Sequence, residues 1–334
     1  MAGVPDALRV SRSGPRPGRR LVVIGNGMAG SRAVEEVLAR GGAGQFSITM
    51  FGDEPHGNYN RRMLGRLLSG AESGAGIFLN QPAWYQENRI TLHAGVTVDR
   101  IDRFTRHVFS SDGRVTPYDT LIIATGSRPY LPPLDGLHTP AGSLKPGIFT
   151  FRTLADIRGM DAHIRKGNRR AVVVAAGLSG SHAAAGPQAV AALRGRGCDV
   201  EVLHSTAAAL LGKDRVGGIR LRDKPDIACD LVVLAAGVRP NVDLAVLSGL
   251  PVERGLVVGD ALRVQDEDDI YALGGCAQYR GEVCESLAAV SRQAAVLAGH
   301  ITGTDTGAAY LGSRNLHKRA DPDACSRGRV VHVT

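Results

Sequence analysis

Residues 20–30 read Arg20-Leu-Val-Val-Ile-Gly-Asn-Gly-Met-Ala-Gly30, and this stretch decides the fold. Its four apolar residues, 21–24, form the short continuous run typical of a parallel strand that is covered on both faces. Gly25, Gly27 and Gly30 follow with the spacing G-x-G-x-x-G. In this pattern the first glycine allows a tight turn, the second lets backbone N–H groups approach a pyrophosphate, and the third lets a helix pack closely on the strand. The stretch therefore predicts a strand, a phosphate-binding turn and a helix.

The neighbouring residues support this prediction, which the glycine spacing alone would not carry. Residues 28–40 predict a helix, and its first residues, Met28 and Ala29, lie at the positive end of the helix dipole, which favours phosphate. A second strand, residues 47–51, is followed by Asp53 and Glu54. Either carboxylate could accept a hydrogen bond from an adenosine ribose.

The net charge of the chain is +8 over 334 residues, and its position argues against nucleic-acid binding. Residues 1–20 carry +4 and residues 313–334 carry +3, so the 292 residues between them carry +1. The charge therefore belongs to two basic tails rather than to a groove on the folded body. We expect residues 1–19 to be disordered, because they are rich in Arg, Pro and Gly and show no periodicity. Residues 313–334 are expected to be irregular.

The remaining composition indicates a globular protein without a membrane segment. Apolar residues make up 43% of the chain, and no apolar run approaches the ~20 residues that span a bilayer. Nor does the N-terminus show a signal peptide, so we expect a cytoplasmic protein. The five cysteines have no metal-ligand or C-x-x-C spacing. This argues against a zinc site, an iron–sulfur cluster or a redox dithiol near the first strand, so structural thiols are expected.

The strand and glycine pattern occurs a second time. Residues 118–129 form a β-run that contains Ala124-Thr125-Gly126, a small strand end that would let a flat cofactor approach. Residues 170–180 resemble the first strand and turn, and residues 231–241, with Gly237, echo the run at 118–129. A strand, glycine turn and helix that occur twice, each closed by a strand ending in glycine, imply two nucleotide-binding domains.

Other segments give a coarser picture. We expect a strand at 90–98, a hairpin at 106–115 on an Asp112-Gly113 turn, and a short helix at 63–68. Further strands are expected at 198–203 and 215–221. Residues 269–277 are expected to contain a last strand that leads into a glycine turn, and an Ala-rich helix is expected at 285–301.

With these motifs in order, the chain resembles the pyridine-nucleotide, FAD-dependent oxidoreductases that include ferredoxin and rubredoxin reductases. It is most similar to the N-terminal flavoprotein portion of the NAD(P)H nitrite reductase large subunit of nitrate assimilation. The resemblance covers residues 20–314 and is carried by the stretches 22–30, 51–61, 124–129, 147–154, 236–241 and 270–274.

The resemblance implies an α/β fold with two Rossmann-like domains, the second inserted in the first. It implies FAD in the first domain, with the pyrophosphate at the glycine turn and the ribose at Asp53 or Glu54. Arg61 would then lie near the flavin, Val98 near the adenine, and Thr125 and Gly126 near the diphosphate. It also places cofactor contacts at Ala124, Gly274 and Gly275 in the first domain, and at Gly177, Gly180 and Gly237 in the second.

Several residues depart from the family pattern. Ala175 occupies the first glycine position of the second fingerprint, and His182 replaces the usual acid. Gly186-Pro187 is expected to interrupt the following helix. Gly275 stands where the family has Asp or Glu, whose carboxylate binds the flavin ribityl chain. Only residues 205–229 separate two strands of the second domain, so about one β–α unit is expected to be missing.

The sequence leaves two hypotheses open. In the first, the chain passes electrons from NADH or NADPH through FAD to a separate protein acceptor, such as a siroheme or iron–sulfur reductase component; it could not reduce nitrite alone. In the second, it is a degenerate relative that binds FAD or a protein partner without NAD(P)H turnover. Both predict an FAD domain at 20–145 and 255–312, and a truncated NAD(P)-binding-like domain at 150–250 in which NAD(P)H binding is weak or lost. The oligomeric state stays open.

Overall fold

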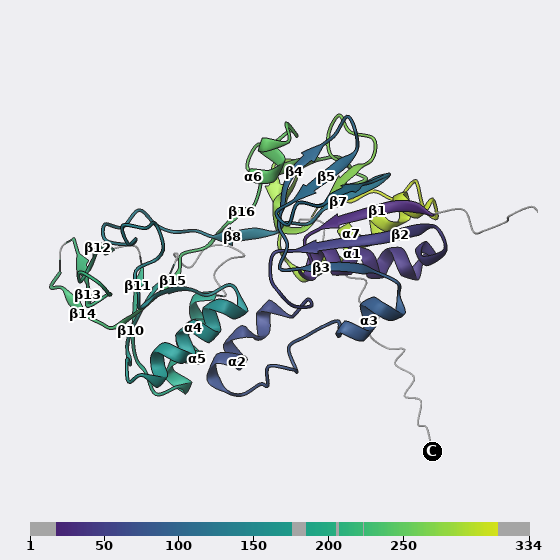
Figure 1. Cartoon of the computed structure of the whole chain (residues 1–334). Helices are drawn as coiled ribbons and strands as arrows, with labels where there is room; N and C mark the ends of the chain where they lie inside the picture. The colour runs from purple at the N-terminus through teal and green to yellow at the C-terminus, as the bar shows by residue number, and fades with distance from the viewer. Residues whose placement is uncertain (1–17, 176–184, 205–206, 223, 313–334) are drawn as a thin grey trace, which may run out of the picture.

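The computed structural model describes residues 18–175, 185–204, 207–222 and 224–312. The expected tails therefore lie outside the described residues, except for Gly18 and Arg19, and Arg19 already begins the first strand. Figure 1 shows two lobes joined by the short strands β8 and β16. No helix in the described part of the chain is long and apolar enough to cross a membrane.

The first lobe is built on a parallel sheet of five strands in the order β18-β7-β1-β2-β3. These strands are β1 (Arg19–Ile24), β2 (Phe46–Gly52), β3 (Thr91–Ala94), β7 (Thr120–Ile123) and β18 (Ile270–Ala272). Residues Leu21 to Ile24 are almost fully buried, as the apolar run predicts for a central strand. The strand predicted at residues 47–51 is confirmed as β2, one residue longer at each end.

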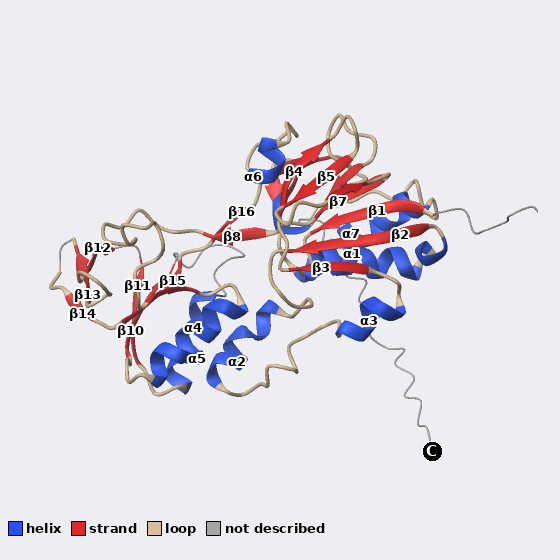
Figure 2. Cartoon of the chain, in the orientation of Figure 1, coloured by secondary structure: helices blue, strands red, loops and turns tan. Residues whose placement is uncertain are grey.

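Helices and a small antiparallel sheet complete the core of this lobe (Figure 2). The helices α1 (Met28–Ala39) and α7 (Leu287–Thr302) pack against each other. The antiparallel sheet contains β4 (Val98–Asp102), β5 (His107–Ser110) and β6 (Val115–Pro117). The hairpin on Asp112-Gly113 is therefore confirmed. The single strand predicted at 90–98 is wrong, because Gly95, at φ +75°, separates β3 from β4, which belong to different sheets.

The second lobe has a parallel sheet of four described strands in the order β11-β10-β15-β9. They are β9 (Ile148–Thr150), β10 (Arg170–Ala175), β11 (Asp199–His204) and β15 (Leu231–Ala235). Alternate residues of β10 face two different cores. Ala171 and Val173 share a core with the helices, whereas Val172 and Val174 face the β12–β14 sheet.

The helices of this lobe are α4 (Leu154–Arg165) and α5 (Ala185–Gly195). They are joined by α2 (Leu64–Ser69), which follows the 3-10 turn η2 (Arg61–Met63) and lies beside both (Figure 1). Leu64 and Leu68 of α2 are buried in the same core as Leu193. The chain of the first lobe therefore reaches across and covers part of the second.

The predicted shortening falls between β11 and β15. The described residues of this interval form the antiparallel strands β12 (Ala207–Leu211), β13 (Gly218–Leu221) and β14 (Ile227–Ala228), and they contain no helix. In the first lobe, the corresponding interval between β2 and β7 also contains α3 (Pro82–Glu87) and the edge strand β3. The described second sheet has no counterpart of β3.

Gly186 and Pro187 do not interrupt their helix, so that prediction is wrong. Both lie inside α5, and Pro187 is its third described residue.

The strands β8 (Ser127–Pro129) and β16 (Val238–Pro240) lead into and out of the inserted lobe and pair antiparallel. The chain then forms α6 (Asp243–Leu247), β17 (Leu256–Val258), the 3-10 turn η3 (Gly274–Cys276), β19 (Ala277–Tyr279) and β20 (Glu282–Val283).

Candidate functional site

A cavity of about 580 Å3 lies at the carboxyl ends of β1, β2 and β7. This is the edge at which open parallel sheets bind ligands. The cavity brings together thirteen of the seventeen residues predicted to bind a cofactor: Gly25, Gly27, Met28, Ala29, Asp53, Glu54, Arg61, Val98, Ala124, Thr125, Gly126, Gly274 and Gly275. The segments that supply them are far apart in the sequence, and the parallel sheet places them at one edge.

The glycine turn after β1 has the geometry that its three glycines predict. Gly25 has φ +114°, and a Cβ atom there would lie 2.2 Å from the carbonyl oxygen of Ala124. Gly30 does not line the cavity, and a Cβ atom there would lie 2.0 Å from the carbonyl oxygen of Gly25. A Cβ atom on Gly27 would meet no atom within 4 Å. The turn is therefore closely packed on the protein side and open at Gly27, on the cavity side.

The N-terminus of α1 faces the same cavity through Met28 and Ala29. Gly27 is the N-cap residue, and no side chain caps the helix. The first turn contains no acidic residue. The N–H groups of a first helical turn have no intrahelical acceptor, and together with the helix dipole they favour an anion.

The strand end after β7 forms the opposite wall. Thr125 donates a hydrogen bond from Oγ1 to the carbonyl oxygen of Asn241 at 2.8 Å, and the Asn241 N–H donates to the carbonyl oxygen of Gly126 at 2.9 Å. Gly126 adopts φ +69°. In the second lobe, Gly237 has the corresponding place between β15 and β16 with φ +103°, and it does not line the cavity.

A model of the pyridine nucleotide-disulphide oxidoreductase family matches residues 19–216 and 183–295. The chain belongs to this family. The family predicted from the sequence is therefore confirmed.

Two curated relatives are similar over most of this chain. It is 38% identical over 320 residues to the nitrite reductase [NAD(P)H] of Bacillus subtilis, covering 86% of this chain and 38% of that protein. It is also 38% identical to the assimilatory nitrate reductase electron transfer subunit of the same organism, covering 85% of this chain and 39% of the relative. The chain thus spans about two fifths of the length of these two relatives.

A solved structure confirms the fold. The covalent complex of putidaredoxin reductase with putidaredoxin matches with a TM-score of 0.74 and 24% identity, over 86% of this chain and 76% of that chain. The predicted α/β fold, with two Rossmann-like domains and the second inserted and shortened, is therefore shown.

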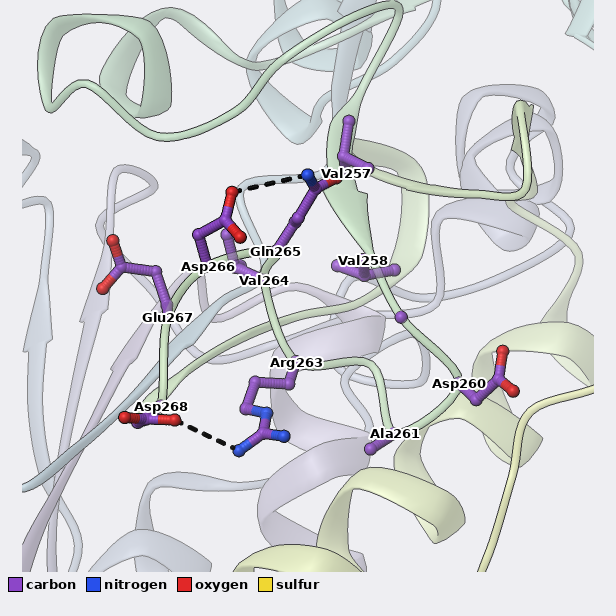
Figure 3. Close-up of a pocket in the computed structure, with 11 residues that line it drawn as sticks. Val257, Val258, Asp260, Ala261, Arg263, Val264, Gln265, Asp266, Glu267 and Asp268 are labelled. Atoms are coloured by element: carbon purple, nitrogen blue, oxygen red, sulfur yellow. Dashed lines mark hydrogen bonds and ion pairs between the residues drawn. The ribbon is translucent and has the colours of Figure 1, made fainter.

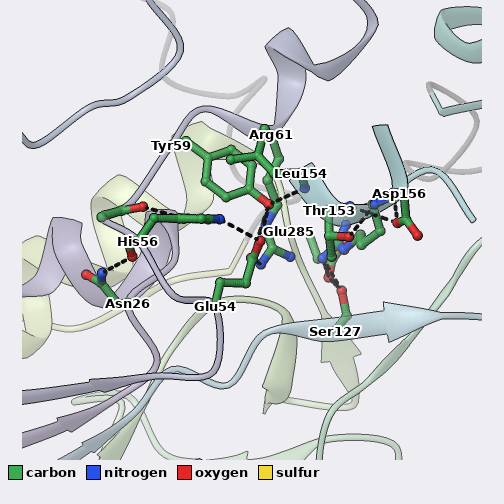
Figure 4. A network of polar contacts seen from close by, with 12 residues as sticks. Asn26, Glu54, His56, Tyr59, Arg61, Ser127, Thr153, Leu154, Asp156 and Glu285 are labelled. Carbon is green, nitrogen blue, oxygen red and sulfur yellow. Dashed lines mark hydrogen bonds and ion pairs between the residues drawn. The ribbon is translucent and has the colours of Figure 1, made fainter. Parts of the chain in front are cut away.

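The two acidic residues after β2 have different surroundings in this chain. Glu54 accepts hydrogen bonds from the hydroxyl of Tyr59 at 2.8 Å and from Nη2 of Arg61 at 3.0 Å, and Nε2 of His56 lies 3.6 Å from it (Figure 4). Burial raises the pKa of Tyr59, which keeps its hydroxyl protonated as the donor. Asp53 is exposed at the cavity. Glu54 therefore orders the wall, while Asp53 lines the cavity as an exposed residue.

A carboxylate from another segment of the chain lies beside Gly275. A Cβ atom on Gly275 would lie 2.1 Å from Oε1 of Glu285, so the Glu285 carboxylate already occupies that space. Ser127 donates a hydrogen bond to the same oxygen, and Nη2 of Arg152 lies 3.4 Å from it. Figure 4 shows Ser127 and Glu285 close together.

Sequence reasoning missed several cavity residues, among them Asn26, His56, Arg152, Asn241 and Glu285. Asn26 is the variable position inside the glycine pattern, and its side-chain oxygen accepts a hydrogen bond from the Tyr85 hydroxyl at 2.9 Å. The other four come from connecting loops. Loop residues carry no periodic signal, but His56, Arg152 and Asn241 lie in the stretches 51–61, 147–154 and 236–241 that carry the family resemblance, so the resemblance could have located them. Glu285 lies outside those stretches.

Three expected positions of the second fingerprint, Gly177, Gly180 and His182, lie outside the described residues. Ala175 is described and remains in β10, where it pairs with Ala235. In the described part of the chain, no group of three or more His, Cys, Asp or Glu residues could hold a metal ion.

A second hollow, of about 490 Å3, is lined by residues from 257 to 268 (Figure 3). It contains none of the predicted site residues. Its acidic side chains have partners, since Asp268 lies 3.5 Å from Nη1 of Arg263 and Asp260 accepts hydrogen bonds from Tyr279 and Arg280.

Proposed function

We propose that the chain binds FAD in this cavity and passes electrons from NADH or NADPH to a separate protein acceptor. The observation that carries the proposal is the glycine turn, which is closed around Gly25 and Gly30 and open at Gly27 toward the cavity. Such a turn suits a pyrophosphate that must come close to the backbone. The cavity volume also lies in the range of about 300–1,000 Å3 that is usual for ligand sites.

Each part of FAD has residues that suit it. The N–H groups at Gly27, Met28 and Ala29 would hold the pyrophosphate, with Thr125 and Gly126 on the other side. Asp53 would accept hydrogen bonds from the ribose, because Glu54 already binds Tyr59 and Arg61. The apolar side chain of Val98 would pack on the adenine. Arg61, held at the wall by Glu54, would lie near the flavin.

When bound, FAD supplies hydride-accepting and electron-donating chemistry, and the protein supplies binding and orientation. The inserted domain would admit the nicotinamide cofactor, and we propose that it does so weakly. Two observations support this. Ala175 stays in its strand where the first domain turns at Gly25, and the described second sheet lacks the edge strand beside β11. Losing that strand removes part of the crevice wall.

The acceptor in this proposal is a protein, such as a siroheme or iron–sulfur component. One relative is named an electron transfer subunit, and a structural neighbour was solved in complex with putidaredoxin. We propose the domain bounds 20–145 with 255–312 for FAD and 150–250 for the inserted domain. We also propose the cytoplasm as its compartment.

A matched pair of glycine substitutions tests FAD binding. Gly27→Ala puts a methyl group into the open turn, where a phosphate would approach, and Gly27 has φ −83°, which alanine tolerates. Gly44→Ala also adds a methyl group into open space, but at an exposed position outside the cavity. We expect Gly27→Ala to weaken FAD binding more than about tenfold, or about 1.4 kcal/mol, without changing the free energy of unfolding. Gly44→Ala should change neither.

Two results would contradict the proposed FAD site. A purified full-length chain that is colourless and takes up no added FAD, followed by absorbance in the flavin bands, contradicts the proposal. Equal FAD affinity of the two glycine variants would contradict the placement of the pyrophosphate.

Anaerobic titration of the FAD-loaded chain with NADH and then NADPH tests the nicotinamide site. We expect flavin bleaching only at concentrations well over tenfold above the micromolar range. Rapid bleaching at micromolar concentrations would contradict the weakened site and establish an active reductase. No bleaching by either nucleotide, with dithionite still reducing the flavin, would favour the degenerate relative.

A further inference from the structure

Three segments meet at the cavity wall beside Gly275. Glu285 comes from the loop before α7, Ser127 from β8, and Arg152 from the connection between β9 and α4. Oε1 of Glu285 accepts the hydrogen bond of Ser127 and lies 3.4 Å from Nη2 of Arg152, which also donates to Ser127. All three residues line the cavity. The carboxylate is therefore held in place by partners from outside its own loop.

The position of this carboxylate depends on glycine at 275. Oε1, Cδ and Cγ of Glu285 lie 2.1, 2.9 and 3.0 Å from the place of a Cβ atom on Gly275. Contacts under about 3 Å are not found for real Cβ atoms, so a side chain at 275 and the present Glu285 conformation exclude each other. The adjacent Gly274 abuts Ala29 in the first turn of α1. The carboxylate thus lies next to the anion-binding end of the cavity.

Electrostatics restricts what a ligand can present to Glu285. A phosphate would be repelled by the carboxylate, whereas a hydroxyl group can donate a hydrogen bond to it. Only 20% of the Glu285 side chain and 23% of the Arg152 side chain are exposed, which strengthens their attraction. Burial lowers the pKa of the Arg152 guanidinium, and the nearby Glu285 carboxylate offsets part of this effect.

We propose that Glu285 binds the hydroxyl-bearing chain of the flavin cofactor and replaces the carboxylate that position 275 cannot supply. This inference rests on the proposed FAD site. Ser127 and Arg152 are positioning residues, because they fix Oε1 of a side chain that lines the cavity. The carboxylate would thus come from position 285 instead of position 275, and glycine at 275 leaves the space for it.

In the family pattern an acid at position 275 binds the flavin ribityl chain, so Gly275→Asp alone could be expected to strengthen FAD binding. Glu285 beside Gly275 predicts the opposite. Gly275→Asp places its Cβ atom against Oε1 of Glu285 and brings two carboxylates together. It should therefore weaken FAD binding in the otherwise unchanged chain. When Glu285→Ala has removed the competing side chain, the same substitution should strengthen FAD binding.

A double-mutant cycle on the full chain tests this, with the dissociation constant of FAD measured by fluorescence titration. We expect Glu285→Ala to weaken FAD binding about tenfold, and Gly275→Asp with Glu285→Ala to return it to within about threefold of the unchanged protein. Glu285→Gln keeps the shape and one acceptor oxygen, so it should lose less than Glu285→Ala and serves if the alanine variant does not fold. Glu282→Gln removes a carboxylate three residues away that does not line the cavity, and it should have no effect.

The outcomes separate this inference from the FAD proposal. An unchanged chain that binds no FAD overturns both. Normal FAD binding that neither Glu285→Ala nor Glu285→Gln weakens overturns the role of Glu285 alone. A Gly275→Asp effect of the same sign and size with and without Glu285 also overturns it, because the two positions would then act independently.

Discussion

The two Rossmann-like domains of this chain are built alike where their strands begin. Arg20 in β1 donates its N–H to Asp119 Oδ2 at 2.7 Å, and Arg170 in β10 donates its N–H to Asp230 Oδ1 at 3.0 Å. In each pair the aspartate N–H donates back to the arginine carbonyl oxygen. The strands that follow the aspartates also end alike, at a glycine with positive φ that leads into β8 or β16.

The domains differ at the opposite, ligand-facing edge. β1 stops at Ile24 and the chain turns at Gly25, whereas β10 continues through Ala175, which pairs with both His204 and Ala235. An L-residue is strained at the φ of +114° that Gly25 adopts, so alanine stays in the strand. The second sheet also lacks a described counterpart of β3.

This comparison shows that the sheet and the nucleotide site depend on different residues. The sheet is held by buried strands and by the Arg–Asp pairs at one edge. The proposed nucleotide site depends on the turn at the other edge. In the second domain Ala175 remains in the strand where the first domain turns at Gly25, while the strand register is kept. A retained Rossmann-like fold is therefore no evidence that a domain still binds its nucleotide.

The largest effect is expected for Gly25→Ala. Alanine at φ +114° is strained, and its Cβ atom would lie 2.2 Å from the Ala124 carbonyl oxygen. The turn must then shift, and we expect FAD affinity to fall about 100-fold or more, or about 3 kcal/mol. Equilibrium FAD titration measures this, with circular dichroism to verify the fold. FAD affinity within threefold of the unchanged protein would show that the turn conformation does not control binding.

The sequence predicts the first domain well, because its signals are periodic and local. The run 21–24 and the glycine spacing specify a buried strand and a turn, and both form. The sequence predicts the shortened second domain from one length alone, that of the interval 205–229 between two strands. It could not predict Glu285 beside Gly275, because two loops bring them together, nor the position of α2 against α5, because a short apolar helix carries no information about which core it joins.

Tyr59→Phe tests a link from the first domain to the inserted one. The Tyr59 hydroxyl donates to Glu54 and accepts the N–H of Leu154 at 3.3 Å, at the first residue of α4. That N–H has no acceptor within its own helix. Phenylalanine removes the hydroxyl from a site that is only 4% exposed. We expect the free energy of unfolding in urea to fall by about 1–2 kcal/mol. A change below about 0.3 kcal/mol would mean that water replaces the hydroxyl.

Ala175→Gly tests the ligand-facing difference between the domains directly. Glycine would allow the chain to turn where β1 turns, while the described second sheet would still lack a counterpart of β3. We therefore expect NADH to bleach the flavin at about threefold to fivefold lower concentration, and FAD affinity to stay unchanged, because Ala175 does not line the FAD cavity. Unchanged bleaching would assign the weakness to the missing strand. A gain beyond tenfold would assign it to the turn alone.

The smallest effect is expected at the sheet edge that is built alike in the two domains. Asp119→Asn and Asp230→Asn each weaken one Arg–Asp pair, and the pairs are partly exposed, so each substitution should lower the free energy of unfolding by about 0.5 kcal/mol.

The hydrogen bond from Arg20 lowers the pKa of Asp119 to about 2, below the value of about 3.9 in an unfolded chain. A carboxylate with a depressed pKa stabilises the fold fully above the unfolded pKa, and this contribution declines as the pH falls from about 4 to 2. The difference in unfolding free energy between the unchanged protein and Asp119→Asn should therefore be constant from pH 7 to 5 and shrink below pH 4. A difference that stays constant down to pH 3, or that grows, would show that the Asp119 charge contributes nothing to the first sheet.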